Sequence, residues 1–352
     1  MKVYKVGGAV RDHFLGLEPK DVDYLVLGSS DKELLSLGYQ QVGLGFPIFI
    51  HPQTRQEYAL PRGNTLEKDL FRRDLTINAM AIGEDGEIFD PYGGQNDLKS
   101  KILRHVSDSF AEDPFRVYRV LRFKAQFTEF TIAPETMELM KKLVVRDDFK
   151  TQTTERIMKE LGVIFALPKP SLFFAGLKDL GALSCFFREL EMLNPIDWSF
   201  TLRLLDQVSS SYEDETVRFS ALVYLFEPDA AKKLCDRIQA PNVWAEAAQV
   251  TSRHRKDVED ILELDPSSIV HKLYAMDGFR KPNLVWNLAL VCEAAESLGP
   301  SPKTTRSEFF RHCFNTVKTI SSKDVSPLLR GAMVGEAIVD ERIKALKRAL
   351  RN

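Results

Sequence analysis

Two aspartates near the N-terminus have the spacing of a metal-binding pair. Asp21 and Asp23 stand two residues apart in "KDVDYLVLG", a run whose apolar and β-branched residues predict a strand. Residues i and i+2 of a strand share one face, about 6–7 Å apart, so the two carboxylates could hold divalent ions together. Such ions activate an attacking hydroxyl and stabilise a leaving phosphate. A D-x-D pair alone also fits a solvated strand edge or turn.

A glycine pair and an arginine precede the two aspartates. Gly7, Gly8 and Arg11 lie in "VGGAVRD". Glycine lets the backbone approach phosphate oxygens, the N-terminus of a following helix offers unpaired N–H groups, and arginine can donate two parallel hydrogen bonds. An ordinary Gly-Gly turn is the alternative, but the order of the three motifs within one short segment favours a phosphate-binding site.

Three arginines recur at every third position of "EDPFRVYRVLRF". Three residues turn an α-helix by about 300°, so Arg116, Arg119 and Arg122 are offset by about 60° each and form a slowly winding stripe. Such a stripe needs an anionic partner, and a triphosphate suits it. The complementary surface carries the apolar residues that we expect to be buried: Val117, Val120, Leu121 and Phe123.

The elements that must position these residues change in kind along the chain. Up to about residue 105, short β-rich runs end in Gly or Pro and alternate with helical patterns. Beyond residue 105 nearly every segment has helical periodicity. The sequence therefore predicts an α+β fold with a mixed β-sheet in the head, followed by an all-α region.

Composition limits the class of protein. The 352 residues are 44% hydrophobic, which predicts a large core and more than one structural unit. The 48 basic and 50 acidic residues give a net charge of −2, so a nucleic-acid surface would be a local patch. Four cysteines without a C-x-x-C pair argue against a disulfide framework. No run predicts a signal peptide or a membrane span, and we expect a cytoplasmic protein without a membrane partner.

Five motifs together resemble a known family. "GGAVRD", "KDVDYLVLG", "RRDLTINAM", "DPYGG" and "EDPFRVYRVLRF" are similar, in this order, to the head and neck motifs of bacterial class II tRNA nucleotidyltransferases, the CCA-adding enzymes and poly(A) polymerases. The resemblance covers residues 1 to about 165 and is weaker beyond. It implies a polymerase-β-like nucleotidyltransferase head, a helical neck with a base-reading helix, a helical body and a helical tRNA-binding tail, at residues 1–105, 106–165, 166–250 and 251–352.

The resemblance also implies roles for individual residues. Asp21 and Asp23 would be catalytic and would bind Mg²⁺. Asp74 and Asn78, four apart on an expected helix, would brace the site, and Glu112 would support it. The expected nucleotide contacts are Gly8, Arg11, Arg73, Asp113, Arg116, Arg119 and Arg122.

Asp113 and Arg116 could select the base. Cytosine and adenine each present an amino donor beside a ring-nitrogen acceptor, which one carboxylate and one guanidinium can satisfy together. Uracil and guanine present the reverse polarity and would leave buried polar groups unpaired. The alternative for Asp113 is a helix N-cap, because it precedes Pro114.

The sequence departs from the family pattern at two places. Tyr224-Leu225 stands where many relatives carry the His-Asp metal pair of a phosphohydrolase, and none of the six histidines neighbours another at metal-ligand spacing, so we expect no such activity. Only "PRGN", residues 61–64, connects "EYAL" to "TLEKDLFRRD". CCA-adding relatives usually carry a longer flexible loop there, which helps the base-reading helix change from CTP to ATP, and relatives with a shortened loop tend to add only two C residues.

We therefore expect a template-independent enzyme that adds CC to the tRNA 3′ end from CTP, with a separate enzyme in the same cell adding A. A full CCA-adding enzyme that also uses ATP stays an alternative, because residues 43–47 could replace the missing loop. A poly(A) polymerase is a further alternative. A non-catalytic tRNA-binding module is disfavoured by the intact Asp21, Asp23 and Arg11.

The C-terminal segment "ERIKALKRALRN" is rich in basic residues. It could follow tRNA phosphates or be a solvated helix face. Its basic residues are Arg342, Lys344, Lys347, Arg348 and Arg351.

Overall fold

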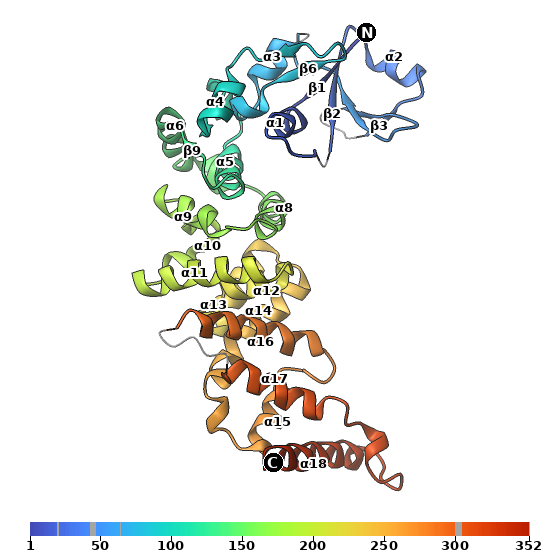
Figure 1. Cartoon of the computed structure of the whole chain (residues 1–352), viewed down its shortest axis with the longest axis vertical. Helices are drawn as coiled ribbons and strands as arrows, with labels where there is room; N and C mark the ends of the chain where they lie inside the picture. The colour runs from blue at the N-terminus through green and yellow to red at the C-terminus, as the bar shows by residue number, and fades with distance from the viewer. Residues whose placement is uncertain (20, 43–46, 64, 300–304, 352) are drawn as a thin grey trace. The chain divides into compact units, whose positions relative to one another are not determined.

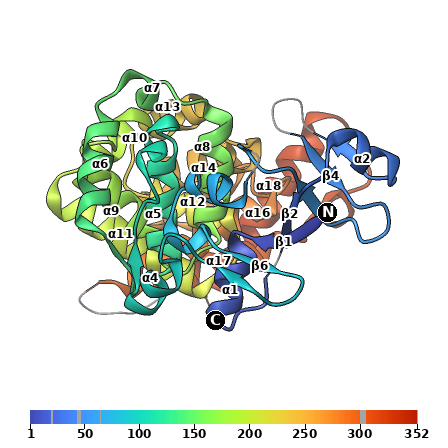
Figure 2. The same cartoon turned by 90° about the horizontal axis from the view of Figure 1, so that it is seen from above.

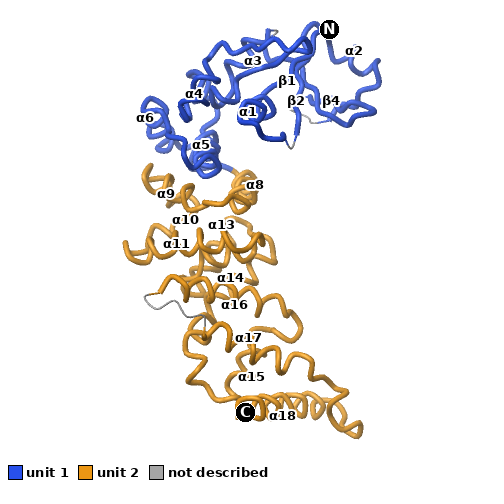
Figure 3. Tube along the Cα trace, viewed as in Figure 1, with its two compact units in different colours: residues 1–152 blue, residues 153–352 orange. Residues whose placement is uncertain are grey.

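The computed structural model describes residues 1–352 except 20, 43–46, 64, 300–304 and 352. The chain forms two compact units, Met1–Gln152 and Thr153–Asn352 (Figure 3). The first unit contains a β-sheet and the second is helical (Figure 1). This confirms the predicted α+β class. The finer division into head, neck, body and tail stays a prediction.

The first unit is built on a seven-stranded mixed sheet with the order β3-β4-β5-β2-β1-β6-β7. Its central pairs are antiparallel except β2 and β5, which run parallel. A separate parallel pair is formed by β8 and β9. The strands are β1 (Lys2–Val6), β2 (Asp23–Leu27), β3 (Gln40–Val42), β4 (Ile48–Ile50), β5 (Glu57–Ala59), β6 (Ala81–Gly83), β7 (Ile88–Phe89), β8 (Ile102–Leu103) and β9 (Thr131–Ile132).

Both faces of this sheet bury apolar side chains, because successive residues of a strand point to opposite sides. In β2, Leu25 packs with Val6 and Leu70 on one face, while Val26 packs with Leu34 and Phe49 on the other. The first helix, α1 (Gly8–Phe14), follows β1 directly and lies beside it (Figure 2). The end of β1, the start of α1 and the start of β2 therefore meet at one edge region of the sheet.

The remaining helices of the first unit continue the chain from the sheet to residue 152. In the described part of this unit, six α-helices and two short 3-10 helices follow α1. The last of them, α7, has only four residues. They are α2 (Asp31–Ser36), α3 (Leu66–Phe71), η1 (Thr76–Asn78), α4 (Gly94–Ser100), η2 (Asp108–Glu112), α5 (Arg116–Gln126), α6 (Pro134–Val144) and α7 (Asp147–Lys150).

The second unit consists of helices with clear start signals. Asn194 caps one of them by accepting hydrogen bonds from the backbone N–H groups of Ile196 and Asp197, both 3.0 Å long, and proline follows as the first helical residue. The helices are α8 (Thr154–Phe165), α9 (Ser171–Asp179), α10 (Ser184–Glu191), α11 (Pro195–Ser211), α12 (Glu215–Leu222), α13 (Pro228–Ile238), α14 (Asn242–Glu259), η3 (Ile261–Glu263), α15 (Pro266–Ala275), α16 (Pro282–Ser297), α17 (Thr305–Val317), η4 (Ser322–Asp324) and α18 (Ala332–Ala349).

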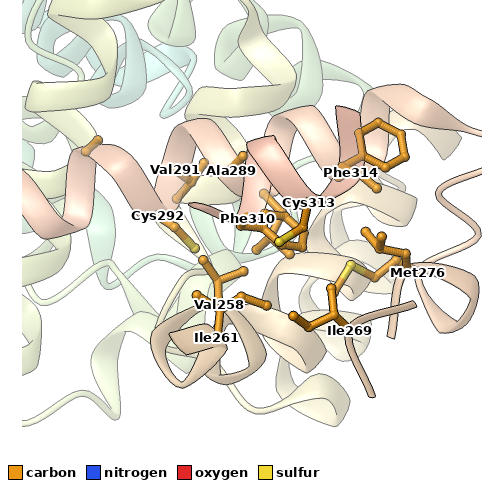
Figure 4. Packing of buried hydrophobic residues seen from close by; sticks show 14 of the residues in the cluster. Val258, Ile261, Ile269, Met276, Ala289, Val291, Cys292, Phe310, Cys313 and Phe314 are labelled. Atoms are coloured by element: carbon orange, nitrogen blue, oxygen red, sulfur yellow. The ribbon is translucent and has the colours of Figure 1, made fainter. Parts of the chain in front are cut away.

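One apolar cluster joins the helices α11, α12 and α14 to α18 of the second unit. Figure 4 shows part of it, where Val258 and Ile261 face Cys292, and Phe310 and Cys313 lie nearby. Tyr224 belongs to the same cluster. Burial raises the pKa of its phenol, and the hydroxyl donates to Glu259 Oε1 at 3.0 Å. Tyr224, which the family resemblance places at the position of a phosphohydrolase metal ligand, is therefore a buried, hydrogen-bonded phenol.

The C-terminal helix α18 corrects one expectation. Arg342 is buried and donates to Tyr274 Oη and to the Ile320 carbonyl, at 2.5 and 2.7 Å. It therefore stabilises the fold and does not join the exposed basic residues, which are Lys344, Lys347, Arg348 and Arg351. Among the described residues, no helix is both long and apolar enough to cross a membrane.

Candidate active site

The two aspartates lie at the start of strand β2. Asp23 is the first residue of this strand and pairs in register with Val6 of β1 on one side and with Glu57 of the parallel strand β5 on the other. Asp21 precedes the strand and is exposed. The parallel pairing therefore brings a third carboxylate, which sequence reasoning missed, to the strand position beside Asp23.

A cavity of about 290 Å³ opens beside Asp23. Its wall combines Asp23 and Glu57 with several arginines, so it can accept a ligand that carries both a cation and phosphate groups. The lining residues are Val6, Asp23, Tyr24, Leu25, Ile48, Glu57, Tyr58, Ala59, Arg62, Asp69, Arg72 and Arg73.

The electrostatics of Asp23 link it to two of its neighbours. Desolvation raises the pKa of Asp23 above its usual value, the positive charge of Arg73 opposes this shift, and the negative charge of Asp21 adds to it. The two aspartates thus repel each other, and a cation bound between them would relieve that repulsion.

The donor set fits a hard divalent cation. Carboxylate oxygens are the ligands that Mg²⁺ prefers, and this ion usually keeps waters and phosphate oxygens as further ligands. In the described parts of the chain, no three His, Cys, Asp or Glu side chains gather closely enough to hold a metal ion. The protein would therefore supply part of the ligand set through Asp21 and Asp23.

The glycine turn lies directly against one of the predicted nucleotide-binding arginines. Gly7 has a φ of +70°, and a Cβ atom there would lie 2.7 Å from Arg73 Nη1. A side chain at Gly7 would therefore displace the guanidinium as well as strain the backbone. Gly8 begins helix α1, so the structure brings the turn, Arg73 and Asp23 into one neighbourhood.

Arg11 is buried within a polar network instead of pointing to solvent. Its guanidinium donates to Asp12 Oδ1 at 2.7 Å and to Asn78 Oδ1 at 2.8 Å. The same guanidinium lies over the rings of Phe123 and Phe127, with distances to the ring centroids of 5.4 and 5.3 Å. Arg11 therefore connects helix α1 to helix α5, and its predicted contact to a nucleotide stays a prediction.

Asp74 is the buried centre of this network. Its carboxylate accepts hydrogen bonds from Arg119 Nη2 at 2.7 Å, Asn78 Nδ2 at 3.1 Å and the backbone N–H of Leu75 at 2.8 Å. Burial alone would raise the pKa of Asp74, but the charge of Arg119 and these hydrogen bonds hold it well below its usual value. Asp74 is therefore ionised and braces the site.

The expectation that Asp74 and Asn78 share a helix is wrong. Helix α3 ends at Phe71, and only residues Thr76–Asn78 form the 3-10 turn η1. The ionised Asp74 bonds the backbone N–H of Leu75, the residue directly after it, and such local bonds compete with continued helix.

The structure places Asp113 before helix α5 and close to Arg116. The Asp113 Oδ1 atom accepts from the backbone N–H of Phe115 at 3.2 Å. The N-cap residue of α5 is Phe115 and not Asp113. The negative charge of Asp113 acts on Arg116. Arg116 donates to the carbonyls of Ser109 and Arg72 at 2.8 and 2.6 Å. These bonds fix the Arg116 guanidinium against the carbonyls of Ser109 and Arg72, and its role in base selection stays a prediction.

The arginine stripe of α5 is half-buried, and its opposite surface is buried as the sequence predicts. Arg122 lies over the Phe123 ring, 4.3 Å from its centroid, and Arg72 pairs with Glu112 at 2.8 Å, which agrees with a supporting position for Glu112. The apolar residues of the opposite surface are each at most 3% exposed: Val117, Val120, Leu121 and Phe123.

Sequence reasoning missed Asp69 as well as Glu57. Asp69 Oδ2 accepts from Arg73 Nη2 at 3.3 Å, four residues along the chain, and this helical spacing was a usable signal. Nothing in the local pattern marks Glu57, because only the pairing of β5 with β2 brings it beside Asp23.

A mixed sheet with an acidic pair beside a glycine turn and several arginines is the arrangement of a nucleotidyltransferase. Two family models match the chain, "Poly A polymerase head domain" over residues 49–104 and "Probable RNA and SrmB- binding site of polymerase A" over residues 129–193. The chain is 37% identical to the Multifunctional CCA protein of Pseudomonas putida, covering 99% of both chains. It is 36% identical to the CCA-adding enzyme of Coxiella burnetii, covering 100% of this chain and 95% of the relative.

Solved structures share the fold. A Thermotoga maritima CCA-adding enzyme complexed with tRNA superposes with a TM-score of 0.74 at 23% identity, over 98% of this chain and 87% of that chain. A CCA-adding enzyme in complex with CTP gives 0.73 at 23% identity, with the same shares covered. The chain belongs to the bacterial class II family of CCA-adding nucleotidyltransferases, and its polymerase-β-like fold is confirmed.

The ionised Asp74 should make the stability of the protein depend on pH. The folded state lowers the pKa of Asp74 below its usual 3.8, so its contribution to stability is present above about pH 4 and is lost as the pH falls further. Asp74→Asn should reduce the free energy of unfolding by roughly 3 kcal/mol at pH 7. The difference between wild type and variant should shrink at pH 3, as measured by urea unfolding.

The exposed Asp31 gives a matched control, because Asp31→Asn removes the same charge from the surface and should change stability by less than about 0.5 kcal/mol. An equal loss at pH 7 and pH 3 for Asp74→Asn would contradict the assigned ionisation.

Proposed function

We propose that this chain extends the 3′ end of tRNA with two C residues, using CTP and releasing pyrophosphate, and that it stops there. Membership of the CCA-adding family supports the reaction and the tRNA substrate. The same proposal divides the chain into four parts. They are the head at residues 1–105, the neck at 106–165, the body at 166–250 and the tRNA-binding tail at 251–352.

The short connector between β5 and α3 is the observation that carries the CC-only product. β5 ends at Ala59 and α3 begins at Leu66. Within this span, the backbone N–H of Arg62 donates to Asp69 Oδ1 at 3.1 Å. A segment so short, bonded near its middle to the helix that follows, cannot extend far as a lever, at about 3.5 Å per residue. The other candidate segment, residues 43–47, lies outside the described residues except for Pro47.

The carboxylates and arginines have separate tasks in the proposed reaction. Asp21 and Asp23 would hold Mg²⁺, which when bound supplies the positive charge that activates the 3′-hydroxyl and stabilises the leaving pyrophosphate. Arg11, Arg73, Arg119 and Arg122 would contact the nucleotide, with Gly8 allowing close approach.

Asp113 and Arg116 would read the base. The Asp113 carboxylate accepts from the cytosine amino group, and Arg116 donates to the ring nitrogen. Arg116 already donates to two backbone carbonyls, so its position is fixed before CTP arrives. This fixed position supports selection of cytosine or adenine over uracil and guanine without a template, because the reversed polarity of uracil and guanine would leave Asp113 and Arg116 unsatisfied.

A full CCA-adding enzyme is the second candidate, and the names of the relatives favour it. In that case ATP would also be a substrate, whereas under our proposal a separate enzyme adds the A residue. Tyr224 offers no metal ligand in the second unit, and we propose no phosphohydrolase activity.

The product distinguishes the two candidates. A tRNA lacking CCA, incubated with CTP and ATP at low enzyme concentration, should end in CC when products are resolved at single-nucleotide length. A dominant CCA end would overturn the CC-only proposal and establish ordinary CCA addition. Elongation with ATP alone would instead identify a poly(A) polymerase.

The metal pair gives a direct test of catalysis. Asp21→Asn and Asp23→Asn should each reduce C addition by at least about a thousandfold, because the remaining carboxylate cannot hold the ion in place. Binding of tRNA and the thermal midpoint should change little. Substantial Mg²⁺-dependent activity in either purified variant would contradict the assignment, and Glu57→Gln would show how far the neighbouring carboxylate shares the role.

Base selection and phosphate binding should separate in a pair of variants. Asp113→Ala should raise incorporation of UTP and GTP relative to CTP by roughly tenfold or more, since it removes the base-reading acceptor. Arg122→Ala should raise KM for all four nucleotides alike, because phosphate contacts carry no base information. If Asp113→Ala leaves the CTP-to-UTP preference unchanged, Asp113 is only a helix cap.

A further inference from the structure

A single carboxylate connects the short connector to the arginine beside the acidic pair. Asp69 is buried on helix α3, at 8% exposure. Its Oδ1 atom accepts from the backbone N–H of Arg62 at 3.1 Å, and its Oδ2 atom accepts from Arg73 Nη2 at 3.3 Å. All three residues line the cavity that contains Asp23.

The Arg73 guanidinium has few other contacts to hold it. Its Nη1 donates to the Asn78 carbonyl at 3.4 Å, and its Nε is buried without a hydrogen-bond partner among the described residues. On the opposite side the guanidinium lies against Gly7, where a Cβ atom would approach it to 2.7 Å. The ion pair with Asp69 therefore holds one side of the Arg73 guanidinium, while Asn78 and Gly7 contact its Nη1 atom.

We propose that Asp69 is a positioning residue for nucleotide binding, which fixes the Arg62 segment and Arg73 as one rigid wall of the cavity. Arg62 is then a fixed part of the nucleotide site in this chain. The inference rests on the proposed function, because it assumes that the cavity beside Asp23 receives the triphosphate of CTP.

The charge of Arg73 already acts on Asp23 across this cavity, so the arginine is close to the place where phosphates would meet the acidic pair. A carboxylate that neutralised Arg73 completely would weaken phosphate binding. At 3.3 Å the Asp69 contact is longer than the usual 2.7–2.9 Å of a charged hydrogen bond, and it leaves Arg73 able to bind a phosphate in addition.

Asp69→Asn tests the role, because asparagine keeps the size of the side chain and removes its charge. KM for CTP should rise about tenfold and kcat should fall less than about threefold, since the ground-state position of Arg73 is lost while the acidic pair stays. The ratio of CTP to UTP incorporation should not change, because Asp69 acts on phosphate binding through Arg73 and not on the base-reading pair. Glu67→Gln, an exposed acid on the same helix, is the matched control and should leave both constants unchanged.

A double-mutant cycle separates positioning from general stability. If Asp69 acts through Arg73, the variant with both Asp69→Asn and Arg73→Ala should have the same KM as Arg73→Ala alone. Additive effects, or an Asp69→Asn variant that behaves like Glu67→Gln, would overturn the proposal. So would a parallel loss of kcat and thermal midpoint without a change in KM, which indicates a purely structural role.

Two further measurements keep the outcome clear. If Asp69→Asn folds poorly, Asp69→Glu is the second variant, because it retains the charge. It should recover at least part of the affinity for CTP. A folded Asp69→Glu variant without any recovery would count against the proposal. Calorimetric binding of CTP to wild type and variant tests Asp69 without turnover. Wild-type protein that binds CTP but adds no C to tRNA would refute the proposed function alone, and equal CTP binding by wild type and Asp69→Asn would refute this inference alone.

Discussion

The buried carboxylate of Asp74 is the interaction on which the arrangement of the first unit depends. It pairs with Arg119 of helix α5 and with Asn78, whose side-chain oxygen in turn accepts from Arg11 of helix α1. A buried carboxylate that lost these partners would cost on the order of several kcal/mol. Helix α1, the turn η1 and helix α5 are therefore held together by one continuous polar chain, which fixes the glycine turn relative to the arginine stripe.

Pairing with acidic side chains also explains how a nearly neutral chain can carry several arginines close to the candidate site. At the cavity, Arg73 pairs with Asp69 and Arg72 with Glu112, and in the buried network Arg119 pairs with Asp74. Each pairing holds a guanidinium in a defined position and reduces repulsion between neighbouring arginines. Under the proposed function, a triphosphate would meet preorganised donors, so less conformational entropy would be lost on binding than with free side chains.

The second unit uses buried polar groups for a different purpose. Tyr224 donates to Glu259 within an apolar cluster, and Arg342 lies 3.4 Å from the Phe279 ring centroid while it donates to Tyr274. These contacts satisfy polar atoms that the helices bury, and so favour one packing arrangement over others. A basic residue in a helical pattern is thus no guide to a nucleic-acid surface until its burial is known, as Arg342 shows.

The sequence by itself determined the α+β class, the family and the burial of the apolar surface of α5, because periodicity and motif order are local properties of the chain. It also indicated that Asp74 and Asn78 brace the site, although not the turn that carries them. Only the tertiary structure decided that Glu57 stands beside Asp23, that Arg11 and Arg342 are buried, and that Asp69 holds the connector and Arg73 together. These depend on which strands pair and which helices pack, and such long-range contacts leave no periodic signal in the segments that make them.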